Sequence, residues 1–382
     1  MKILCIIGTR PEAIKMAPVI RLIKTDSRFE VFVCTTSQHR EMLSSALDIF
    51  GIKPDYNLDL MQENQSMFDI SASILKNIEP VLVTTSPDLI LVQGDTTTAF
   101  IGALAAFYFR VKIAHIEAGL RTYNKSSPFP EEMNRQLITR LADLHFVPTP
   151  EAEKNLLKEN VSESSIFLTG NTGTDALKYA LSFLETKENS AEGISFPEIP
   201  MLLNEGLKDP SKKLILVTSH RRENFGEGIL NICNALIEIS LRDDVLIAVL
   251  VHPNPNVRNQ IIKLLSGKQN IFLLDPLDYL SFVHLMTSSY LILTDSGGIQ
   301  EEAPYLGKPV LVTRQNTERM EPVEAGTAKI TGVLSDEIVK ETIRLLDNKV
   351  EYQNMTRSHL PFGDGKAAEK ILDVLAKYRL SE

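Results

Sequence analysis

The sequence predicts an α/β protein made of two Rossmann-like, doubly wound domains that face each other across a cleft. Three observations support this fold class. Short, almost wholly apolar runs of strand length recur along the chain, as is typical of parallel strands buried on both faces. Stretches with helical periodicity separate these runs. The chain has 382 residues, which is longer than one typical core and favours two domains.

The composition excludes several classes of function. The chain is 43% hydrophobic and 23% charged, as in a soluble enzyme, and its net charge of −9 argues against sequence-independent nucleic-acid binding. No apolar run reaches membrane-spanning length, and residues 1–12 are interpreted as a first strand and turn, not as a signal peptide. Cys5, Cys34 and Cys233 lie in apolar or strand-like segments without metal-ligand spacing. We therefore expect a cytoplasmic protein with reduced thiols and without nucleic-acid or membrane partners.

The first domain is expected at residues 1–172. Its predicted strands cover residues 2–8, 29–36, 87–93, 112–117, 145–148 and 166–169, and the clearest helices between them cover residues 67–84, 99–109 and 132–144. The first strand ends in a turn that places Arg10 at the start of a helix. Such a turn is a usual place for an anionic ligand in an α/β sheet.

Three carboxylates belong to the strand ends of this domain. Asp95 follows the strand at residues 87–93, Glu117 ends the next strand, and Glu131 lies in the loop after it. We expect these side chains to lie at neighbouring strand ends if the sheet is parallel. Like charges held close raise one another's pKa, so that one pocket can hold a proton donor and a base. The alternative is a solvated acidic loop balanced by Arg121 and Arg135, and the turn position of Asp95 argues against it.

The second domain is expected at residues 173–360. Residues 184–213 are polar and weakly periodic, and we interpret them as a linker with a surface insertion. Strands are predicted at residues 214–218, 245–251, 271–274, 291–294 and 310–313. Residues 361–382 contain a glycine loop and a helix at residues 366–378, which we expect to pack back on the first domain.

The strongest motif is TDSGGIQEEA at residues 294–303. A strand ends here, two glycines remove side-chain bulk, and a helix predicted at residues 299–306 directs its N-terminus at the turn. Backbone N–H groups and the helix dipole predict a diphosphate site that needs no metal. Glu302 is placed to bind the hydroxyl groups of a ribose. A capped helix after a glycine turn is the alternative interpretation.

A second polar turn follows the strand at residues 214–218 and contains His220, Arg221 and Arg222. Two arginines and an imidazole suit a diphosphate, and the surrounding residues are too polar for a buried core. The sequence contains no Asp-X-Asp pattern, no Walker A loop and no zinc-binding spacing. We therefore expect no metal site and no cofactor.

Taken together, these segments resemble the non-hydrolysing UDP-N-acetylglucosamine 2-epimerases. The likeness is carried in register by GTRPEAIKMAP, SQHREML, GDTTT, HIEAGLRT, SPFPEEMNRQL, GNTGTDAL, HRRENFGEGI, TDSGGIQEEAPYLGKPV and FGDGKA. The resemblance implies a GT-B-type fold, a homodimer, and reversible interconversion of UDP-GlcNAc and UDP-ManNAc for bacterial surface polysaccharides. The chemistry expected is elimination and re-addition of UDP through 2-acetamidoglucal, because a proton beside an amide nitrogen is not acidic until positive charge grows at carbon 1.

The resemblance also assigns residues. The catalytic positions that it implies are Asp95, Glu117, Glu131 and His220. The substrate-binding positions expected from motif and resemblance are Arg10, Lys15, Arg135, Ser296, Gly297, Gly298, Glu302 and Arg319. Some members are activated by their own substrate at a regulatory site, and the matching positions here are Gln38, Glu41 and Asn64. Asn64 stands where the regulated members carry arginine. Which carboxylate acts on which face of the sugar stays open.

Three other functions fit parts of this pattern. A hydrolysing epimerase with the same fold would release UDP and free ManNAc, but the HIEAGLR and PEEMNR segments are not typical of that class. A GT-B glycosyltransferase fits the fold and the UDP site equally well, and the three carboxylates argue against it. A nucleotide-sugar-binding regulator without turnover is the third alternative, against which the intact acid/base set argues.

Overall fold

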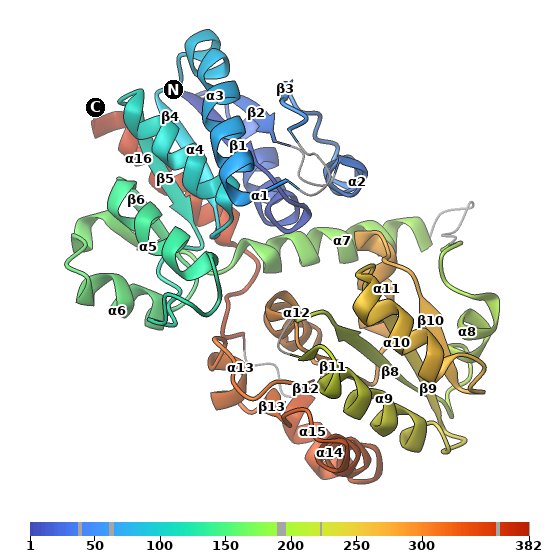
Figure 1. Cartoon of the computed structure of the whole chain (residues 1–382). Helices are drawn as coiled ribbons and strands as arrows, with labels where there is room; N and C mark the ends of the chain where they lie inside the picture. Colours follow the sequence, from blue (N-terminus) through green and yellow to red (C-terminus); the bar gives the residue numbers. More distant parts are fainter. Residues whose placement is uncertain (37–39, 61–64, 189–195, 222–223, 357–359, 382) are drawn as a thin grey trace. The chain divides into compact units, whose positions relative to one another are not determined.

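The computed structural model describes residues 1–36, 40–60, 65–188, 196–221, 224–356 and 360–381 (Figure 1). The chain divides into two compact units, Met1–Tyr179 with Phe362–Glu382, and Ala180–Pro361. Each unit contains one parallel sheet with helices around it, so the predicted α/β fold class is confirmed. The domain limits expected from the sequence stay a prediction, because compactness alone does not define an independently folding domain.

The first unit contains a seven-stranded sheet in the order β3-β2-β1-β4-β5-β6-β7. The strands are β1 (Lys2–Ile7), β2 (Glu30–Thr35), β3 (Tyr56–Asn57), β4 (Leu89–Gln93), β5 (Lys112–Ile116), β6 (Leu144–Val147) and β7 (Ile166–Leu168). All of their pairings are parallel. The strand order reverses between β1 and β4, and ligands of such sheets bind beyond the carboxyl ends of the strands at this switch point.

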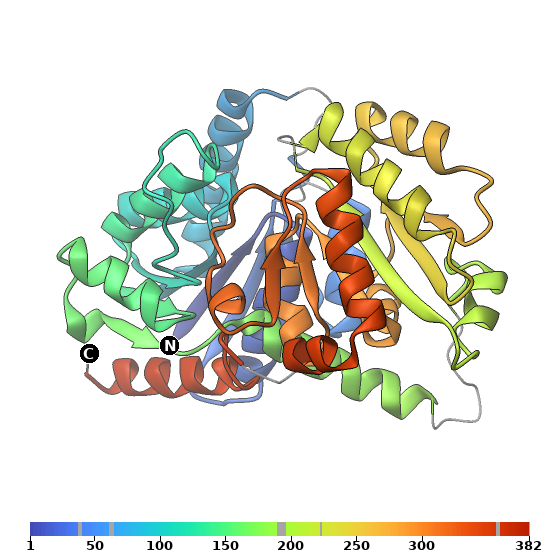
Figure 2. The ribbon, with the colours of Figure 1, turned by 90° about the horizontal axis from the view of Figure 1, so that it is seen from below.

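The helices of the first unit follow the strands in turn. They are α1 (Arg10–Lys24), α2 (Arg40–Ile49), α3 (Met67–Thr85), α4 (Thr97–Tyr108), α5 (Glu131–Leu141), α6 (Pro150–Lys158), the 3-10 turn η1 (Glu163–Ser165), the first part of α7 (Thr172–Glu188), and α16 (Ala367–Ser381). Helix α16 packs against α1, and Figure 2 shows it in red beside the blue elements of this unit. Its first turn is held by Asp175, whose carboxylate accepts hydrogen bonds from Ala367 N and Ala368 N at 3.1 and 2.9 Å.

The second unit contains a six-stranded sheet in the order β10-β9-β8-β11-β12-β13. The strands are β8 (Lys213–Ser219), β9 (Val245–Val251), β10 (Ile271–Leu274), β11 (Leu291–Thr294), β12 (Val310–Val312) and β13 (Ala328–Ile330). The helices are α8 (Met201–Gly206), α9 (Glu227–Ile239), α10 (Pro255–Leu265), α11 (Tyr279–Ser288), α12 (Gly297–Glu302), η3 (Ala303–Leu306), α13 (Glu321–Glu324), α14 (Ser335–Asp347) and α15 (Lys349–Thr356). The switch point of this sheet lies between β8 and β11.

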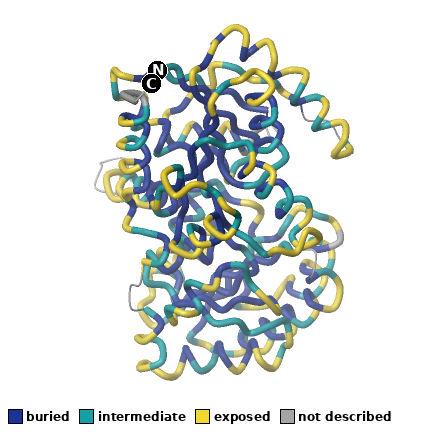
Figure 3. The backbone as a smooth tube through the Cα atoms, turned by 90° about the vertical axis from the view of Figure 1, so that its left-hand side faces the viewer, coloured by how far each residue is buried: buried dark blue, intermediate teal, exposed yellow. Residues whose placement is uncertain are grey.

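Each unit has its own apolar interior. In Figure 3 the buried residues run through the centre of each unit, while exposed residues follow the outer helices. Strand β4 is buried along its whole length, and the strands β8 and β9 are buried at nearly every residue. Within the part of the chain that the structure describes, no helix combines the length and the apolarity needed to cross a membrane.

The structure departs from the sequence expectation in several places. The strands β3 and β13 were not predicted, because two or three residues carry too little periodicity. The segment interpreted as a linker, residues 184–213, contains the end of α7 and the whole of α8. The helix expected at residues 299–306 consists of the six-residue α12 and the 3-10 turn η3. Pro304 explains this break, because proline cannot donate the backbone hydrogen bond that would continue the α-helix.

Candidate active site

Two of the predicted carboxylates lie at the carboxyl edge of the first sheet. Strands β4 and β5 are adjacent, with Gln93 opposite Ile116, so Asp95 and Glu117 follow neighbouring strand ends next to the switch point. Glu117 has a φ of +65°. A residue with a side chain adopts this left-handed conformation at a cost of about 1–3 kcal/mol, and such strain is concentrated at functional sites.

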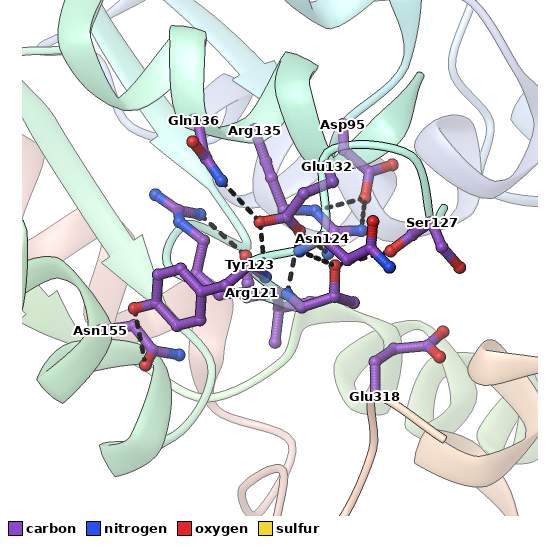
Figure 4. A network of polar contacts seen from close by, with 12 residues as sticks. Asp95, Arg121, Tyr123, Asn124, Ser127, Glu132, Arg135, Gln136, Asn155 and Glu318 are labelled. Carbon is purple, nitrogen blue, oxygen red and sulfur yellow. Dashed lines mark hydrogen bonds and ion pairs between the residues drawn. The ribbon is translucent and has the colours of Figure 1, made fainter. Parts of the chain in front are cut away.

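Asp95 is held by two neighbouring residues of α5. Arg135 Nη2 and Nε lie 2.5 and 3.1 Å from Asp95 Oδ2 (Figure 4). Asn134 Nδ2 donates to the backbone oxygen of Asp95 at 2.9 Å. Because both the carboxylate and the peptide of Asp95 are fixed, its other carboxylate oxygen, Oδ1, has a defined direction at the sheet edge.

The buried glutamate of this network is Glu132, which was not predicted and which follows the predicted Glu131 in α5. Glu132 is fully buried and accepts hydrogen bonds from Thr122 N and Tyr123 N, both at 3.0 Å, so it fixes the loop before α5. It also lies 3.2 Å from Arg135 Nη1. Glu131 is half-buried at the first position of α5, and no ion pair or hydrogen bond of its side chain is seen among the described residues. Helical periodicity could have identified Glu132 from the sequence, because Glu132 and Arg135 are three residues apart and therefore lie on the same face of a helix.

Glu117 is held by α1 and β4. Lys15 Nζ forms an ion pair with Glu117 Oε2, and Gln93 Nε2 donates to the same oxygen at 3.0 Å. The sequence predicted like charges held close at neighbouring strand ends, and in the structure Asp95 and Glu117 each lie against a cation. Lys15 and Arg135, predicted as substrate-binding residues, therefore also position the carboxylates.

Glu12 is a further buried acid at this edge that sequence reasoning missed. Its carboxylate accepts hydrogen bonds from Gly8 N at 3.2 Å, Thr9 N at 2.7 Å and Thr96 Oγ1 at 2.8 Å. It thereby links the turn after β1, where Arg10 begins α1, to the turn after β4. Burial raises the pKa of Glu12 to about 7, against the opposing effect of its hydrogen bonds with Thr9 and Thr96.

His115 contacts the turn after β4 from the neighbouring strand β5. It is fully buried on β5, and its Nε2 lies 2.7 Å from the backbone oxygen of Gly94, directly before Asp95. Burial lowers the pKa of His115 to about 3, so the ring is neutral. Because a carbonyl oxygen only accepts hydrogen bonds, Nε2 carries the proton. His115 therefore fixes the peptide that leads into Asp95.

At the edge of the second sheet, His220 is paired with Asp295. His220 follows β8 and Asp295 follows the adjacent strand β11, with His220 Nδ1 3.0 Å from Asp295 Oδ1. The imidazole of His220 also stacks near that of His252, with ring centroids 6.1 Å apart. Burial, together with the nearby His220, lowers the pKa of His252. Asp295 was not predicted, although it stands in the motif that was judged strongest.

The glycine turn of the second unit lies against a cluster of ion pairs. Ser296 is the N-cap residue of α12, Gly297 and Gly298 are its first residues, and Glu302 is its last. A Cβ atom on Gly297 would lie 3.2 Å from Arg319 Cζ, so this glycine allows the guanidinium to pack closely.

Arg319 is bound in turn by two acids. Its Nη2 lies 2.9 Å from Glu301 Oε1, and its Nη1 lies 2.9 Å from Glu318 Oε1. Burial disfavours the charge of Glu318, but Arg319, Arg314 and Arg221 outweigh it and lower the pKa to about 2. The three arginines thus surround one ionised carboxylate beside the glycine turn.

The predicted regulatory positions lie beyond what the structure describes. Gln38 and Asn64 fall outside the described residues, and Glu41 belongs to α2 without a described side chain. Among the described residues, no group of three histidine, cysteine, aspartate or glutamate side chains is arranged to hold a metal ion.

Two Rossmann-like units, each built on one parallel sheet, are typical of the GT-B fold. A glycotransferase of kitacinnamycin shares this fold over 98% of both chains, with a TM-score of 0.64 at 11% identity. The UDP-N-acetylglucosamine 2-epimerase family matches residues 21–376, and the chain belongs to this family. The resemblance to UDP-N-acetylglucosamine 2-epimerases is therefore confirmed.

Relatives match the chain over its whole length. The UDP-N-acetylglucosamine 2-epimerase of Campylobacter jejuni is 50% identical over 382 residues, which cover 100% of this chain and 99% of the relative. That of Escherichia coli (strain K12) is 49% identical over 384 residues and 100% of both chains. The structure of UDP-GlcNAc 2-epimerase from Neisseria meningitidis bound to UDP-GlcNAc has a TM-score of 0.90 at 44% identity, covering 99% of this chain and 100% of that one.

A more distant structure has the same architecture. The UDP-GlcNAc 2-epimerase from Methanocaldococcus jannaschii, in complex with UDP-GlcNAc and UDP, has a TM-score of 0.83 at 33% identity and covers 99% of this chain and 100% of that one. Family membership supports UDP-N-acetylglucosamine 2-epimerase activity, which is an isomerase reaction.

Proposed function

We propose that this protein interconverts UDP-GlcNAc and UDP-ManNAc without hydrolysis, by elimination and re-addition of UDP through 2-acetamidoglucal. In the elimination, a base removes the proton from carbon 2, the bond from carbon 1 to the UDP oxygen breaks, and UDP leaves with the electron pair. A double bond then joins carbons 1 and 2. In the return step, UDP adds to carbon 1 and a proton is delivered to the other face of carbon 2. No net oxidation or reduction takes place.

The observation that carries this proposal is the pair of carboxylates at adjacent strand ends. Removing a proton from one face of the sugar and delivering one to the other requires at least two acid/base groups. Asp95 and Glu117 follow β4 and β5, and each is fixed by a cation, Arg135 and Lys15. We assign acid/base roles to these two and to Glu131, whose side chain is half-buried at the start of α5. A sheet edge that only binds a nucleotide would need at most one acid/base group.

The second unit supplies the chemistry expected around a departing diphosphate. Developing negative charge on UDP is best stabilised by donors that are already in place. We propose that His220, the turn from Ser296 to Gly298, and Arg319 bind the diphosphate, together with Arg10 of the first unit. Glu302 is proposed to bind the ribose hydroxyl groups. Relatives whose structures contain UDP-GlcNAc support this choice of ligand.

The test is incubation of the protein with UDP-GlcNAc in D2O, followed by proton NMR. We expect UDP-ManNAc to appear and both epimers to acquire deuterium at carbon 2, because the abstracted proton exchanges with solvent. Small amounts of UDP and 2-acetamidoglucal released during turnover would support the elimination step directly.

Two other results would point elsewhere. Accumulation of free ManNAc and UDP to completion would assign the protein to the hydrolysing epimerases. An unchanged spectrum despite measurable UDP binding would favour a GT-B glycosyltransferase, for which no acceptor was supplied, or a nucleotide-sugar-binding regulator. Either result would overturn the proposed reaction.

We further propose a cytoplasmic homodimer that supplies N-acetylmannosamine units for surface polysaccharides. Resemblance to the family supports these three points. Gel filtration with light scattering tests the dimer, since a single species of about 42.7 kDa, the mass of one chain, would contradict it. Deletion of the gene followed by analysis of surface sugars tests the biosynthetic role, and loss of N-acetylmannosamine is the expected outcome.

A further inference from the structure

The carboxylate of Asp295 is fully buried and is surrounded by donors from a single segment of chain. Its Oδ2 accepts hydrogen bonds from Ser219 Oγ at 2.9 Å, Arg221 N at 3.0 Å and Asn224 Nδ2 at 2.9 Å. His220 N lies 3.1 Å from Oδ1 and 2.9 Å from Oδ2. A buried carboxylate is tolerated only with such compensation. Asp295 therefore holds the residues that directly follow β8 in place through these hydrogen bonds.

The side chain of His220 completes this arrangement. Its Nδ1 lies 3.0 Å from Oδ1, and His220 is the one basic side chain paired with Asp295 among the described residues. Burial opposes ionisation, but the hydrogen bonds and the charge of His220, with the backbone donors, lower the pKa of Asp295 below its usual range. An ionised carboxylate only accepts hydrogen bonds, so Nδ1 must carry a proton.

We propose that Asp295 is the positioning residue of His220. It keeps the proton on Nδ1, so that Nε2 faces the substrate, gives its proton to the departing diphosphate oxygen during elimination and takes it back when UDP re-adds. In the neutral ring, Nε2 then holds a lone pair. In the charged ring, the carboxylate stabilises the imidazolium, and Nε2–H donates to the diphosphate. The same division of labour between an acid and an imidazole operates in other His-Asp pairs. The inference rests on the proposed function, in which His220 contacts UDP.

The test compares Asp295→Asn with the wild-type protein. In the variant, the amide oxygen is expected to stay where Ser219, Arg221 and Asn224 donate, which turns the amide NH2 group toward His220 Nδ1. Nδ1 then has to accept, so the ring takes the Nε2–H tautomer. We expect kcat to fall by about 10⁴-fold, the loss found when asparagine replaces the aspartate partner of a catalytic histidine and the ring takes the wrong tautomer. The Kd for UDP should change by less than tenfold.

The readout that separates positioning from general damage is the tautomer itself. The chain has seven histidines, and the signal of His220 is identified in 15N-labelled protein by its absence in His220→Gln. Nδ1–H in the wild type and Nε2–H in Asp295→Asn would support the proposal. Nε2–H in the wild type, or no change in the variant, would overturn it. If the variant does not fold, the wild-type spectrum alone decides.

Two further variants complete the design. Asp244→Asn makes the same chemical change at the amino edge of the same sheet, where Asp244 pairs with Arg242 at 2.8 Å, and kcat should stay within twofold of wild type. Adding Asp295→Asn to His220→Gln should lower kcat by less than threefold, because both substitutions disable the same His220–Asp295 pair. A further hundredfold loss would overturn the proposal. A wild-type protein with the Nδ1–H tautomer but no epimerisation would contradict the proposed function and leave the pairing intact.

Discussion

The acids at the two sheet edges differ in what surrounds them, and this difference indicates their roles. The side chains of Asp95 and Glu117 are 25% and 8% exposed, and each lies beside one cation. Glu132 and Asp295 are fully buried and accept hydrogen bonds from backbone N–H groups and neighbouring side chains. Acids of the first kind are suited to proton transfer, whereas acids of the second kind hold loops in place.

Replacement of Asp95 by asparagine tests the first kind. The amide keeps the size of the side chain but cannot take up or deliver a proton, so kcat is expected to fall by about 10²–10⁴-fold. The Kd for UDP, measured by calorimetry, should stay within threefold of wild type. Asp143→Asn is the matched control. Asp143 lies at the opposite edge of the sheet, where its Oδ1 is 2.9 Å from Lys112 Nζ. Turnover above a tenth of wild type in Asp95→Asn would remove Asp95 from the catalytic set.

Glu12 makes the stability of the protein depend on pH. Its pKa of about 7 in the folded protein lies above its ordinary value of 4.5. Between these values the folded state holds a proton that the unfolded state has lost, so the free energy of unfolding falls as the pH rises. A shift of this size corresponds to a loss of about 3 kcal/mol between pH 4.5 and pH 7. The contribution is complete below pH 4.5 and is lost as the pH rises through 7.

Glu12→Gln isolates this effect. Glutamine imitates the protonated acid, since its oxygen accepts from Gly8 N and Thr9 N while its amide donates to Thr96 Oγ1. Urea unfolding of both proteins at pH 5 and pH 8 should show the variant gaining about 2.5 kcal/mol relative to wild type between the lower and the higher pH. Glu151→Gln, on the exposed face of α6, should show no such gain. Equal differences at both pH values would contradict a raised pKa for Glu12.

Sequence reasoning identified side chains by chemical type but could not tell which acid is buried. Asp95 and Glu117 were readable because each follows an apolar strand, and neighbouring strand ends follow from a parallel sheet. Asp295 also follows a strand, yet its role depends on donors from Ser219, His220, Arg221 and Asn224, which lie beside it because β8 and β11 are paired. Glu12 is likewise defined by a hydrogen bond from Thr96, 84 residues away in the chain.

At the scale of elements, the short turns fix how helices meet the sheet. Gly119 has a φ of +85°, and a Cβ atom there would lie 2.3 Å from the backbone oxygen of Ala152 in α6. The turn that carries Glu117 and the helix α6 can therefore approach only because residue 119 lacks a side chain. Apolar contacts of Ala118 and Leu156 close the same interface.

Gly119→Ala is expected to destabilise the first unit by more than conformational strain alone. A left-handed residue with a side chain costs about 1–2 kcal/mol, and forced overpacking adds about 1–3 kcal/mol. Gly51→Ala is the control, because Gly51 has a φ of +64° and its nearest neighbour, Arg21 Nη1, would lie 3.7 Å from the new Cβ. Thermal unfolding should place Gly119→Ala well below Gly51→Ala. Equal melting temperatures would mean that α6 moves away without cost.

Elements were predictable in proportion to their length and regularity. The strands β9, β10 and β11 lie where apolar runs ended at polar turns, at residues 245–251, 271–274 and 291–294. The two-residue strand β3 forms because β2 offers an unpaired edge, and this is a property of the sheet, not of residues 56–57. Helix α8 was missed because six residues give less than two turns of periodicity.

At the scale of the whole molecule, the two parallel sheets have a similar strand order but carry different functional side chains at their carboxyl edges. Each has its switch point beside its first strand, β1 in one unit and β8 in the other. The turns after β1, β4 and β5 in the first unit carry Arg10 and the acids, while the turns after β8 and β11 in the second carry His220 and the glycine turn. Proton transfer at carbon 2 is thus proposed to belong to the first unit, and most of the diphosphate binding to the second.

This division predicts which amides each ligand protects from hydrogen exchange. UDP at 100 times its Kd should stabilise the state to which it binds by about 2.7 kcal/mol. We expect protection by UDP to be strongest in residues 219–221 and 295–298 of the second unit, in wild type and in Asp95→Asn alike. UDP-GlcNAc added to the inactive Asp95→Asn should protect residues 94–98 and 117–122 as well, since the sugar is proposed to meet the carboxylates there. Protection of the first unit by UDP alone, with the second unit unaffected, would contradict this division, because the diphosphate would then bind beside the acids and leave His220 without a ligand.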